Sequence, residues 1–331
     1  MFVKYSSIEN IENSKMVDKV QYEGFSHPSV KWIAQEKIHG TNFSFICDGK
    51  TVVCAKRTGL IGETESFFGY ELILDRYKAQ ILKMFELVKD SMPDLETLTV
   101  FGEFAGPGIQ RQVDYQEKDF WVFDILINGQ LVDSLFMRMM ASNVGLKIAP
   151  VLSVGEFETL ANMERAFDSL IPEFNAFCEE NGVSMANAVV WGPQPKGKDN
   201  IAEGFVIKTV IPAELPNGKR VIFKCKNESF KEKGKTKPVK IVPELSGADQ
   251  AFVFSSTQYI TDQRLSNVLS HIGELSAKDF GKVMGLMTQD IFKDMLVDGL
   301  DPLDCDNPAL VKKSVQSEVT AFLREKWKGL L

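Results

Sequence analysis

Charged residues recur at the ends of short apolar runs in this chain, in an order that suits a charged ligand. In chain order they are Lys37, Arg57, Glu103, Glu203, Lys224 and Lys226. Burying so many charges without a charged ligand would be costly, so the series predicts a site for such a ligand. Its sharpest part is Glu36-Lys-Ile-His-Gly-Thr-Asn42, although this segment alone is also compatible with an ordinary strand corner.

The lysine pair near residue 225 indicates the kind of ligand. Lys224 and Lys226 lie two residues apart in a strand-like run, residues 220–226, so their side chains share one face. Two neighbouring ammonium groups repel each other, which suits a polyanion better than it suits stability. The pair belongs to a basic block, residues 219–240, with a net charge of +7 in a chain of net charge −7. This block predicts a phosphate-binding surface; the alternative is a solvated lysine loop.

The elements that must position these residues are strands from about residue 28 to 226. Short runs rich in Val, Ile and Phe alternate there with turn residues. Asp48-Gly49 and Asn128-Gly129 are typical of tight hairpins, so the sheets should be largely antiparallel. Apolar residues at three- and four-residue spacings predict helices over residues 70–89 and 157–170. We therefore expect an α+β domain of antiparallel sheets with flanking helices.

The pattern changes after residue 243, where helical spacing replaces the strand-like runs. Apolar spacing predicts a helix over residues 280–296. Asn307-Pro308 is typical of a helix start, with Asn as the N-cap and Pro at the first helical position. The sequence thus predicts a small all-helical second domain. We expect a first domain at residues 1–240, a linker at 241–246 and the helical domain at 247–331.

The composition excludes several classes of protein. Of 331 residues, 44% are hydrophobic and 25% charged, which is typical of a globular protein and not of a disordered chain or a coiled coil. No apolar run approaches the roughly 18 residues of a membrane span, and the N-terminus lacks a signal-peptide pattern, so we expect a soluble intracellular protein. Five cysteines without a C-x-x-C pair and three histidines argue against zinc. Any metal should be a hard cation held by oxygen.

The ordered series of charges resembles the covalent nucleotidyltransferase superfamily of ATP-dependent polynucleotide ligases and mRNA capping enzymes. It is most similar to the RNA ligase 2 family of T-even-like bacteriophages, which includes RNA-editing ligases. The segments that carry the resemblance are Lys37-Ile-His-Gly-Thr-Asn42, Phe101-Gly-Glu-Phe104, Phe120-Trp-Val-Phe-Asp-Ile125, Ala202-Glu-Gly-Phe-Val-Ile-Lys208 and Phe223-Lys-Cys-Lys-Asn227. The resemblance covers essentially the whole chain, including Lys278-Asp-Phe-Gly-Lys-Val-Met-Gly285.

The resemblance implies that Lys37 attacks the α-phosphate of ATP and becomes a lysyl-AMP. A lysine amine must first lose its proton, which burial and the cations Arg57, Lys224 and Lys226 would favour. The two lysines would also hold the α-phosphate. A divalent cation, Mg²⁺ or Mn²⁺, would offset the developing charge, with Glu203 as its candidate protein ligand.

The resemblance also implies contacts with the rest of the nucleotide. Glu103 would accept a hydrogen bond from a ribose hydroxyl, and Phe123 would stack on the adenine. The backbone at Glu36 and Ile38 would read the base edge, and Asn42 is a further candidate ATP contact. For Phe123 the alternative is core packing, because it lies in an apolar run; alternation places it on the face opposite Phe120.

Two further residues of the matching segments are candidates for the catalytic site. His39 follows Lys37 by two residues, and the alternative is a hydrogen-bonded turn histidine. Asp124 lies beside the apolar run and would pair with a nearby cation.

The part of the chain after Lys226 reads as helices, which differs from the β-barrel domain of DNA ligases and capping enzymes. By resemblance, this helical domain engages nicked double-stranded RNA and acts in the later steps of sealing. Lys56, Arg264, Asp290 and Asp294 are the candidate RNA-binding or sealing residues; for Asp294 the alternative is a solvated helix face. We expect a monomer with no obligate protein or membrane partner, in the cytoplasm, which would be the host cytoplasm for a phage protein.

The sequence is also compatible with three other functions. A capping-type guanylyltransferase would carry the same lysine nucleophile but use GTP. A DNA ligase would seal DNA instead of RNA. A non-catalytic RNA-binding protein on the same fold would not require the nucleophile and both carboxylates together.

Overall fold

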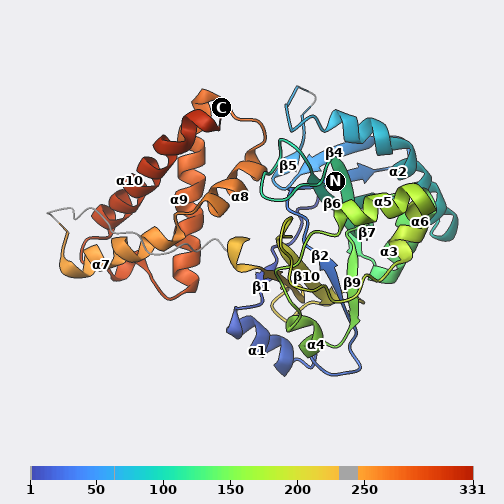
Figure 1. Cartoon of the computed structure of the whole chain (residues 1–331), viewed down its shortest axis with the longest axis horizontal. Helices are drawn as coiled ribbons and strands as arrows, with labels where there is room; N and C mark the ends of the chain where they lie inside the picture. Colours follow the sequence, from blue (N-terminus) through green and yellow to red (C-terminus); the bar gives the residue numbers. More distant parts are fainter. Residues whose placement is uncertain (1, 63, 231–244, 331) are drawn as a thin grey trace. The chain divides into compact units, whose positions relative to one another are not determined.

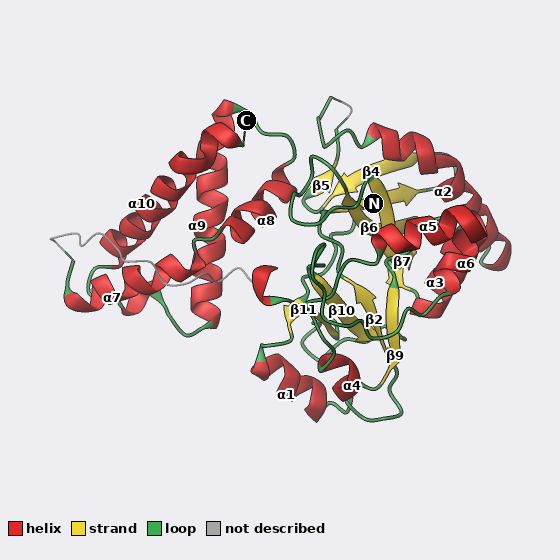
Figure 2. Ribbon diagram, viewed as in Figure 1, coloured by secondary structure: helices red, strands yellow, loops and turns green. Residues whose placement is uncertain are grey.

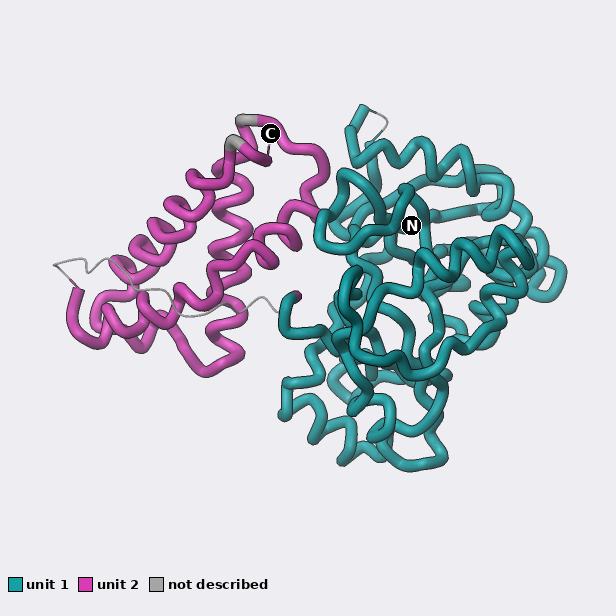
Figure 3. The backbone as a smooth tube through the Cα atoms, in the orientation of Figure 1, with its two compact units in different colours: residues 1–229 teal, residues 230–331 magenta. Residues whose placement is uncertain are grey.

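The computed structural model describes residues 2–62, 64–230 and 245–330. It divides into two compact units, residues 1–229 and 230–331 (Figure 3). The second half of the basic block and most of the predicted linker at 241–246 lie outside the described residues.

A six-stranded antiparallel sheet forms one half of the first unit, in the order β5-β4-β3-β6-β7-β8 (Figure 1). Its strands are β3 (Thr41–Cys47), β4 (Val52–Lys56), β5 (Gly59–Leu60), β6 (Leu98–Ala105), β7 (Asp119–Ile127) and β8 (Gln130–Leu131). The predicted hairpins are present: Asp48-Gly49 joins β3 to β4, and Asn128-Gly129 joins β7 to β8. Asn128 (φ 48°) and Gly129 (φ 80°) both have the positive φ that such tight turns need.

A five-stranded sheet forms the other half, in the order β1-β11-β10-β2-β9. Its strands are β1 (Glu9–Asn10), β2 (Trp32–Glu36), β9 (Val151–Gly155), β10 (Gly204–Thr209) and β11 (Ile222–Lys226). All neighbours are antiparallel except β1 and β11. The strand β2, which ends just before Lys37, pairs with β10 on one side and β9 on the other.

Helices cover the outer faces of the two sheets (Figure 2). They are α1 (Ser14–Tyr22), α2 (Glu71–Ser91), α3 (Ser134–Val144), α4 (Phe157–Ala161), α5 (Ile171–Asn181) and α6 (Val183–Ala188), with a 3₁₀ turn η1 (Glu228–Phe230). Buried residues of α2 and α3 share one core with the six-stranded sheet, and those of α1 and α4 share another with the five-stranded sheet. The remaining faces meet, since Lys208 of β10 forms an ion pair with Asp124 of β7. Both predicted components of the α+β class, antiparallel sheets and flanking helices, are confirmed.

One predicted helix is wrong over most of its length. The apolar spacing over residues 157–170 gives only the five-residue helix α4, and residues 162–170 are irregular. The carbonyls of Ala166 and Phe167 accept hydrogen bonds from the N–H groups of Gly197 and Ala202, which lie far along the chain. Phe167 and Leu170 are nevertheless buried. The apolar spacing therefore indicated correctly which residues are buried, but not that they form a helix.

The second unit is all-helical over residues 245–330, as predicted (Figure 2). Its helices are α7 (Gly247–Ser256), α8 (Asp262–Ile272), α9 (Phe280–Val297) and α10 (Pro308–Lys326), with 3₁₀ turns η2 (Thr257–Tyr259), η3 (Ala277–Asp279), η4 (Pro302–Asp304) and η5 (Trp327–Gly329). The Asn307 side chain caps α10 by accepting from the N–H of Leu310, and Pro308 opens the helix. Buried residues of all four α-helices form a single core. None of the described helices of either unit combines the length and apolar character that a membrane crossing requires.

Candidate active site

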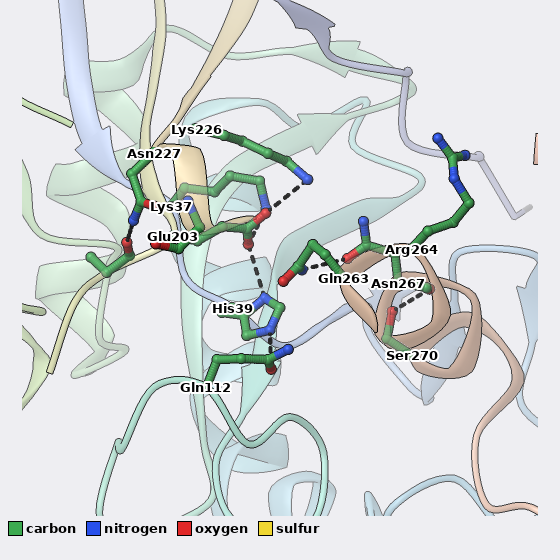
Figure 4. Close-up of polar contacts among 12 residues, drawn as sticks. Lys37, His39, Gln112, Glu203, Lys226, Asn227, Gln263, Arg264, Asn267 and Ser270 are labelled. Atoms are coloured by element: carbon green, nitrogen blue, oxygen red, sulfur yellow. Dashed lines mark hydrogen bonds and ion pairs between the residues drawn. The ribbon is translucent and has the colours of Figure 1, made fainter. Parts of the chain in front are cut away.

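Lys37 lies at the end of β2, where the backbone fixes its position. Its N–H donates to the carbonyl of Gly204 at 2.9 Å, which extends the pairing of β2 with β10. Its Nζ donates to Oε2 of Glu203 at 2.8 Å (Figure 4). The Lys37 side chain is 21% exposed and the Glu203 side chain 2%, so the amine is accessible while its carboxylate partner is buried. The two residues, 166 positions apart in the chain, therefore meet at one point.

Glu203 is the centre of this cluster. Its Oε1 lies 3.1 Å from Nζ of Lys226, and its Oε2 lies 3.1 Å from Nδ1 of His39. Burial raises the pKa of Glu203, but the charges of Lys37 and Lys226 outweigh it and hold the pKa well below its usual range. Glu203 is therefore a carboxylate at neutral pH, surrounded by donors.

The second lysine of the pair shares a face with the first. In β11, Cys225 is buried in the core of the five-stranded sheet. Alternation along the strand then places Lys224 and Lys226 together on the opposite face. This is the arrangement that the two-residue spacing predicts.

Two glycines let the backbone segments of this site approach closely. A Cβ at Gly204 would lie 2.1 Å from the carbonyl oxygen of Cys225, and Gly204 has a φ of +128°. A Cβ at Gly40 would lie 2.3 Å from the carbonyl oxygen of Phe104. Any side chain at either position would displace the segment that carries Glu203 or Lys37.

His39 is held at three points. Its ring contacts Glu203 through Nδ1, and its Nε2 lies 2.8 Å from Oε1 of Gln112 (Figure 4). Its backbone N–H donates to the hydroxyl of Tyr115 at 2.7 Å. With 2% of its surface exposed, His39 is a buried member of the cluster.

Glu103 lies on β6 beside the segment that follows Lys37. Its Oε1 accepts a hydrogen bond from the N–H of Gly40 at 3.3 Å, and its cross-strand neighbour on β3 is Asn42. Burial raises the pKa of Glu103 to about 7, although the charges of Lys37 and Arg57 oppose this rise. Arg57 follows β4 and thus contributes its charge to the same site.

The side chain of Glu36 is committed to the fold. Its carboxylate accepts from the hydroxyl of Ser169 at 2.6 Å and from the N–H of Leu170 at 2.8 Å, just before α5. Its own N–H donates to the carbonyl of Pro150 at 2.9 Å. Burial raises the pKa of Glu36 to about 7. The Glu36 carbonyl oxygen is therefore the candidate group of this residue for a contact with a base. The side chain of Ile38 is buried.

Phe123 and Asp124 lie at a bulge in β7, where the pairing with β6 shifts register. Phe123 is half-buried and its ring lies edge-on to that of Tyr5, with centroids 5.0 Å apart. It does not belong to the core that contains Phe120, so the two rings lie on different faces of β7, as alternation predicts.

Asp124 pairs with cations, as the sequence leads us to expect. It accepts from Lys208 Nζ at 2.7 Å and from Arg220 Nη1 at 2.7 Å, and the hydroxyl of Tyr5 donates to it at 2.5 Å. Burial raises the pKa of Asp124, but Arg220 and Lys208 overcome it and keep the pKa well below its usual range. Lys208 also donates to the carbonyl of Phe123 at 2.5 Å, so this ion cluster fixes the backbone beneath the Phe123 ring.

The candidate RNA-binding residues lie apart from this cluster in the sequence. Lys56, at the end of β4, forms an ion pair with Glu65. In the second unit, Arg264 is fully buried and forms ion pairs with Asp290 and, at 2.7 Å, with Asp294. The two aspartates are 37% and 41% exposed, so Arg264 holds them at the surface of the helical unit.

Sequence reasoning missed several partners of the predicted residues. Gln112 and Tyr115 contact His39. They lie in a loop between the segments 101–104 and 120–125, and the loop has no hydrophobic pattern that would single them out. Tyr5 and Ser169 were given no role from the sequence, because each acts through a contact more than 100 residues away in the chain. Only Arg220 and Lys208 carried a signal, since both are charged residues in strand-like runs.

Around a β-sheet core, a lysine, a buried carboxylate and a pair of cations thus define a site suited to covalent phosphate chemistry. Comparison with known proteins identifies the family. Residues 30–226 match the RNA ligase family, and residues 246–321 match the T4 RNA ligase 2 C-terminal family. The first match covers more than half of the chain, which therefore belongs to the RNA ligase family. The predicted enzyme class, an RNA ligase, is confirmed.

Individual relatives are more distant. RNA-editing ligase 1, mitochondrial, of Trypanosoma brucei brucei is 25% identical over 379 residues, covering 91% of this chain and 78% of that protein. RNA-editing ligase 2, mitochondrial, of the same organism is 24% identical over 413 residues, covering 100% of this chain and 92% of that protein. A solved Naegleria gruberi RNA ligase variant with ATP and Mn is 16% identical with a TM-score of 0.48, covering 70% of this chain and 58% of that one.

Proposed function

We propose that this RNA ligase uses ATP to seal 3′-hydroxyl/5′-phosphate nicks in duplex RNA, through lysyl-AMP on Lys37 and then an RNA-adenylate. One observation carries the proposal. The Lys37 amine and the Lys226 ammonium both lie within about hydrogen-bond distance of the same buried carboxylate, that of Glu203, at 2.8 and 3.1 Å. A nucleophile and a phosphate-binding cation thus share one site.

In the first step, the deprotonated amine of Lys37 forms a bond to the α-phosphorus of ATP. The bond from this phosphorus to the oxygen bridging to the β-phosphate breaks, and pyrophosphate leaves with the electron pair. Lys224 and Lys226, on one face of β11, hold the α-phosphate oxygens as their charge rises. The product is a phosphoramidate that stores AMP on Lys37.

The nucleoside of ATP would be held by residues around the same point. Glu103, which the pKa of about 7 leaves partly protonated, would bind a ribose hydroxyl, and the half-buried Phe123 ring would stack on the adenine. The carbonyl of Glu36 and the backbone of Ile38 would contact the base edge. Asn42, the cross-strand neighbour of Glu103, completes this set.

The residues of the site fit a divalent cation only together with ATP. In the parts of the chain that the structure describes, no group of three or more His, Cys, Asp or Glu side chains could hold a metal ion. Beside Lys37, Glu203 offers an ionised, buried carboxylate, and Mg²⁺ commonly takes one or two carboxylates with substrate phosphate oxygens. Mg²⁺ or Mn²⁺ bound there would neutralise charge on the phosphates.

The later steps would use the helical unit. The 5′-phosphate of the nick takes AMP from Lys37, and the 3′-hydroxyl then displaces AMP to close the strand. Asp290 and Asp294, presented at the surface by Arg264, are the candidate sealing residues there, and Lys56 is a further RNA contact. A phage origin, a monomeric state and a cytoplasmic location remain predictions from the sequence.

Labelling with nucleotide tests the first step. Incubation with α-labelled ATP should label the wild-type chain and a Lys31→Ala control, whose lysine is exposed, but not Lys37→Ala. Labelling by GTP alone would instead indicate a capping-type guanylyltransferase. Wild-type chain that binds nicked RNA but takes no label would be a non-catalytic RNA-binding protein.

Sealing of matched nicked duplexes tests the substrate. One duplex carries RNA on the 3′-hydroxyl side of the nick and the other carries DNA. We expect clearly faster sealing of the RNA version, and equal rates would remove the RNA specificity from the proposal. Binding to either duplex should weaken steeply with added salt, since phosphate contacts release counterions.

A further inference from the structure

The contacts of His39 come from two directions. Nδ1 faces Oε2 of Glu203 at 3.1 Å, towards the nucleophile. Nε2 faces Gln112 at 2.8 Å, and the backbone N–H reaches the hydroxyl of Tyr115 at 2.7 Å. Gln112 and Tyr115 belong to one segment between β6 and β7. The loop that carries Gln112 and Tyr115 therefore contacts His39 at atoms other than Nδ1, which faces Glu203.

The orientation of this imidazole bears directly on the nucleophile. The oxygen of Glu203 that faces Nδ1 is the same Oε2 that accepts the Lys37 amine at 2.8 Å. If the ring turned, the Glu203 carboxylate would still be held at Oε1 by Lys226 but would lose the contact of Oε2 with His39. Oε2 could then move more easily with the lysine. A fixed ring therefore fixes the position of Oε2, the carboxylate oxygen that accepts the hydrogen bond of the Lys37 amine.

A glutamine suits this task because of its chemistry. The amide can present either its carbonyl oxygen or its NH₂ group to Nε2 by turning about its last bond. It can therefore keep the ring in place whether Nε2 carries a proton or not. A carboxylate could only accept and an ammonium could only donate, so neither would serve both states.

The burial of His39 and Gln112 agrees with an arrangement in which Gln112 positions His39 and His39 positions Glu203. His39 is 2% exposed, whereas Gln112 is exposed. Gln112 thus contacts the His39 ring from the protein surface, and the ring contacts Glu203 in the interior. Figure 4 shows this chain of contacts from Gln112 through His39 and Glu203 to Lys37.

We propose that Gln112 is a positioning residue for adenylate formation, which acts by orienting His39 and, through it, the carboxylate that aims Lys37. This inference rests on the proposed function. It assigns to an exposed loop side chain a part in the rate of the chemical step and none in binding ATP.

Substitution at Gln112 tests the assignment. Gln112→Met keeps the length of the side chain and removes both hydrogen-bonding groups. Gln112→Glu keeps an acceptor of the same length. Gln21→Met is the matched control, because Gln21 makes an exposed hydrogen bond to Glu158 on another surface.

The first readout is the rate of lysyl-AMP formation in single turnovers across ATP concentrations. In Gln112→Met we expect the maximal rate to fall about 10- to 100-fold, while the ATP concentration giving half that rate stays nearly unchanged. Gln112→Glu should have a rate between those of the wild type and Gln112→Met, because a carboxylate can hold the ring in only one of its two states. Gln21→Met should keep the full rate. A wild-type maximal rate in Gln112→Met, or a loss expressed only as weaker ATP binding, would overturn the proposal.

The second readout is independent of activity. The chain has only three histidines, His27, His39 and His271, so long-range ¹H–¹⁵N spectra of their rings are simple to assign. Gln112→Met should shift the His39 ring signals and leave the other two in place. Unchanged His39 signals would overturn the proposal even if the wild type forms lysyl-AMP. A wild-type chain that takes no label would instead refute the proposed function and leave the ring signals as the test of positioning.

Discussion

Phe123 and Phe120 are three residues apart in one strand but have different surroundings. Phe120 is completely buried in the core with α2, whereas the Phe123 ring is half-buried beside Tyr5. A ring that stacks on a base must keep one face accessible, which only Phe123 does. The strand therefore separates a packing residue from a candidate binding residue.

Matched leucine substitutions separate the two roles. Phe123→Leu should raise the KM for ATP at least about five-fold, since a stacked base contributes about 1 kcal/mol or more, with little change in melting temperature. Phe120→Leu should lower the free energy of unfolding by about 1 to 3 kcal/mol and leave the KM of the folded enzyme unchanged. ATP kinetics and urea unfolding of both variants measure this. An unchanged KM in Phe123→Leu would assign that ring to packing.

The ion cluster around Asp124 connects elements from distant parts of the chain. Asp124 lies on β7, Lys208 on β10 and Arg220 just before β11, while Tyr5 precedes β1. All four side chains are buried. Ion pairs of this cluster thus link the two sheets, next to the half-buried Phe123.

Removing the one anion should be costly. Asp124→Asn leaves two buried cations without a counter-charge, and we expect the free energy of unfolding to fall by about 3 to 5 kcal/mol. The control Glu12→Gln breaks an exposed ion pair with Arg165 and should cost less than about 1 kcal/mol. Chemical denaturation at neutral pH compares them. Equal losses in the two variants would show that the Asp124 cluster is no more than a surface contact.

The link between β2 and α5 should make stability depend on pH. Glu36 has a folded-state pKa of about 7, above the ordinary value of 4.5, so the folded chain binds its proton more tightly than the unfolded chain. Stability from this group is therefore greatest at low pH and falls as pH rises towards 7. Between pH 5.5 and 8 the loss should be about 2 kcal/mol.

Glu36→Gln should remove that slope. We expect the variant to be less stable overall, because Ser169 and Leu170 donate to different oxygens of the Glu36 carboxylate and a glutamine keeps only one of these oxygens. Its stability difference between pH 5.5 and 8, measured by urea unfolding, should nevertheless be about 2 kcal/mol smaller than that of the wild type. Glu158→Gln, an exposed control, should keep the wild-type slope. An unchanged slope in Glu36→Gln would show that this carboxyl titrates normally.

The sequence predicted elements better than it predicted contacts. Hairpins with Asp-Gly and Asn-Gly turns and the long helices α2, α9 and α10 follow local rules, so their patterns were sufficient. The irregular stretch at 162–170 was not predictable, because its carbonyls bond to residues about 30 positions away.

The candidate site shows the same division. Lys37, Glu203 and Lys226 were predicted as a group, and the structure brings them together. The commitment of the Glu36 side chain to Ser169 and the contact of Gln112 with His39 were not, since tertiary packing alone decides them. Spacing along the chain reports which face a side chain takes; the partner on that face comes from elsewhere in the fold.

At the scale of the whole molecule, each of the two units has a core of its own. The candidate nucleotide-binding residues all precede residue 227, and the candidate sealing residues Arg264, Asp290 and Asp294 all belong to the helical unit. In the proposed reaction, adenylation of Lys37 therefore uses candidate residues of the first unit, whereas sealing uses those of the helical unit together with Lys56.

A fragment of residues 1–240 should separate these stages. We expect it to fold and to form lysyl-AMP at a rate similar to that of the full chain, but to lose sealing of nicked duplex RNA. Labelling with ATP and sealing assays on the two proteins measure this, with circular dichroism to establish folding. A folded fragment that takes no label would place part of the adenylation machinery after residue 240 and move the proposed domain boundary.

The separation of Lys37 from Glu203 along the chain also determines when the two residues can meet during synthesis. During synthesis, β2 leaves the ribosome long before its neighbour β10, which is needed to complete the sheet. At about 5 to 20 residues per second, the 166 positions from Lys37 to Glu203 take about 10 to 30 s to make. For that interval the nascent chain carries Lys37 without Glu203, so the proposed transfer of AMP to Lys37 would have to wait until most of the first unit has left the ribosome.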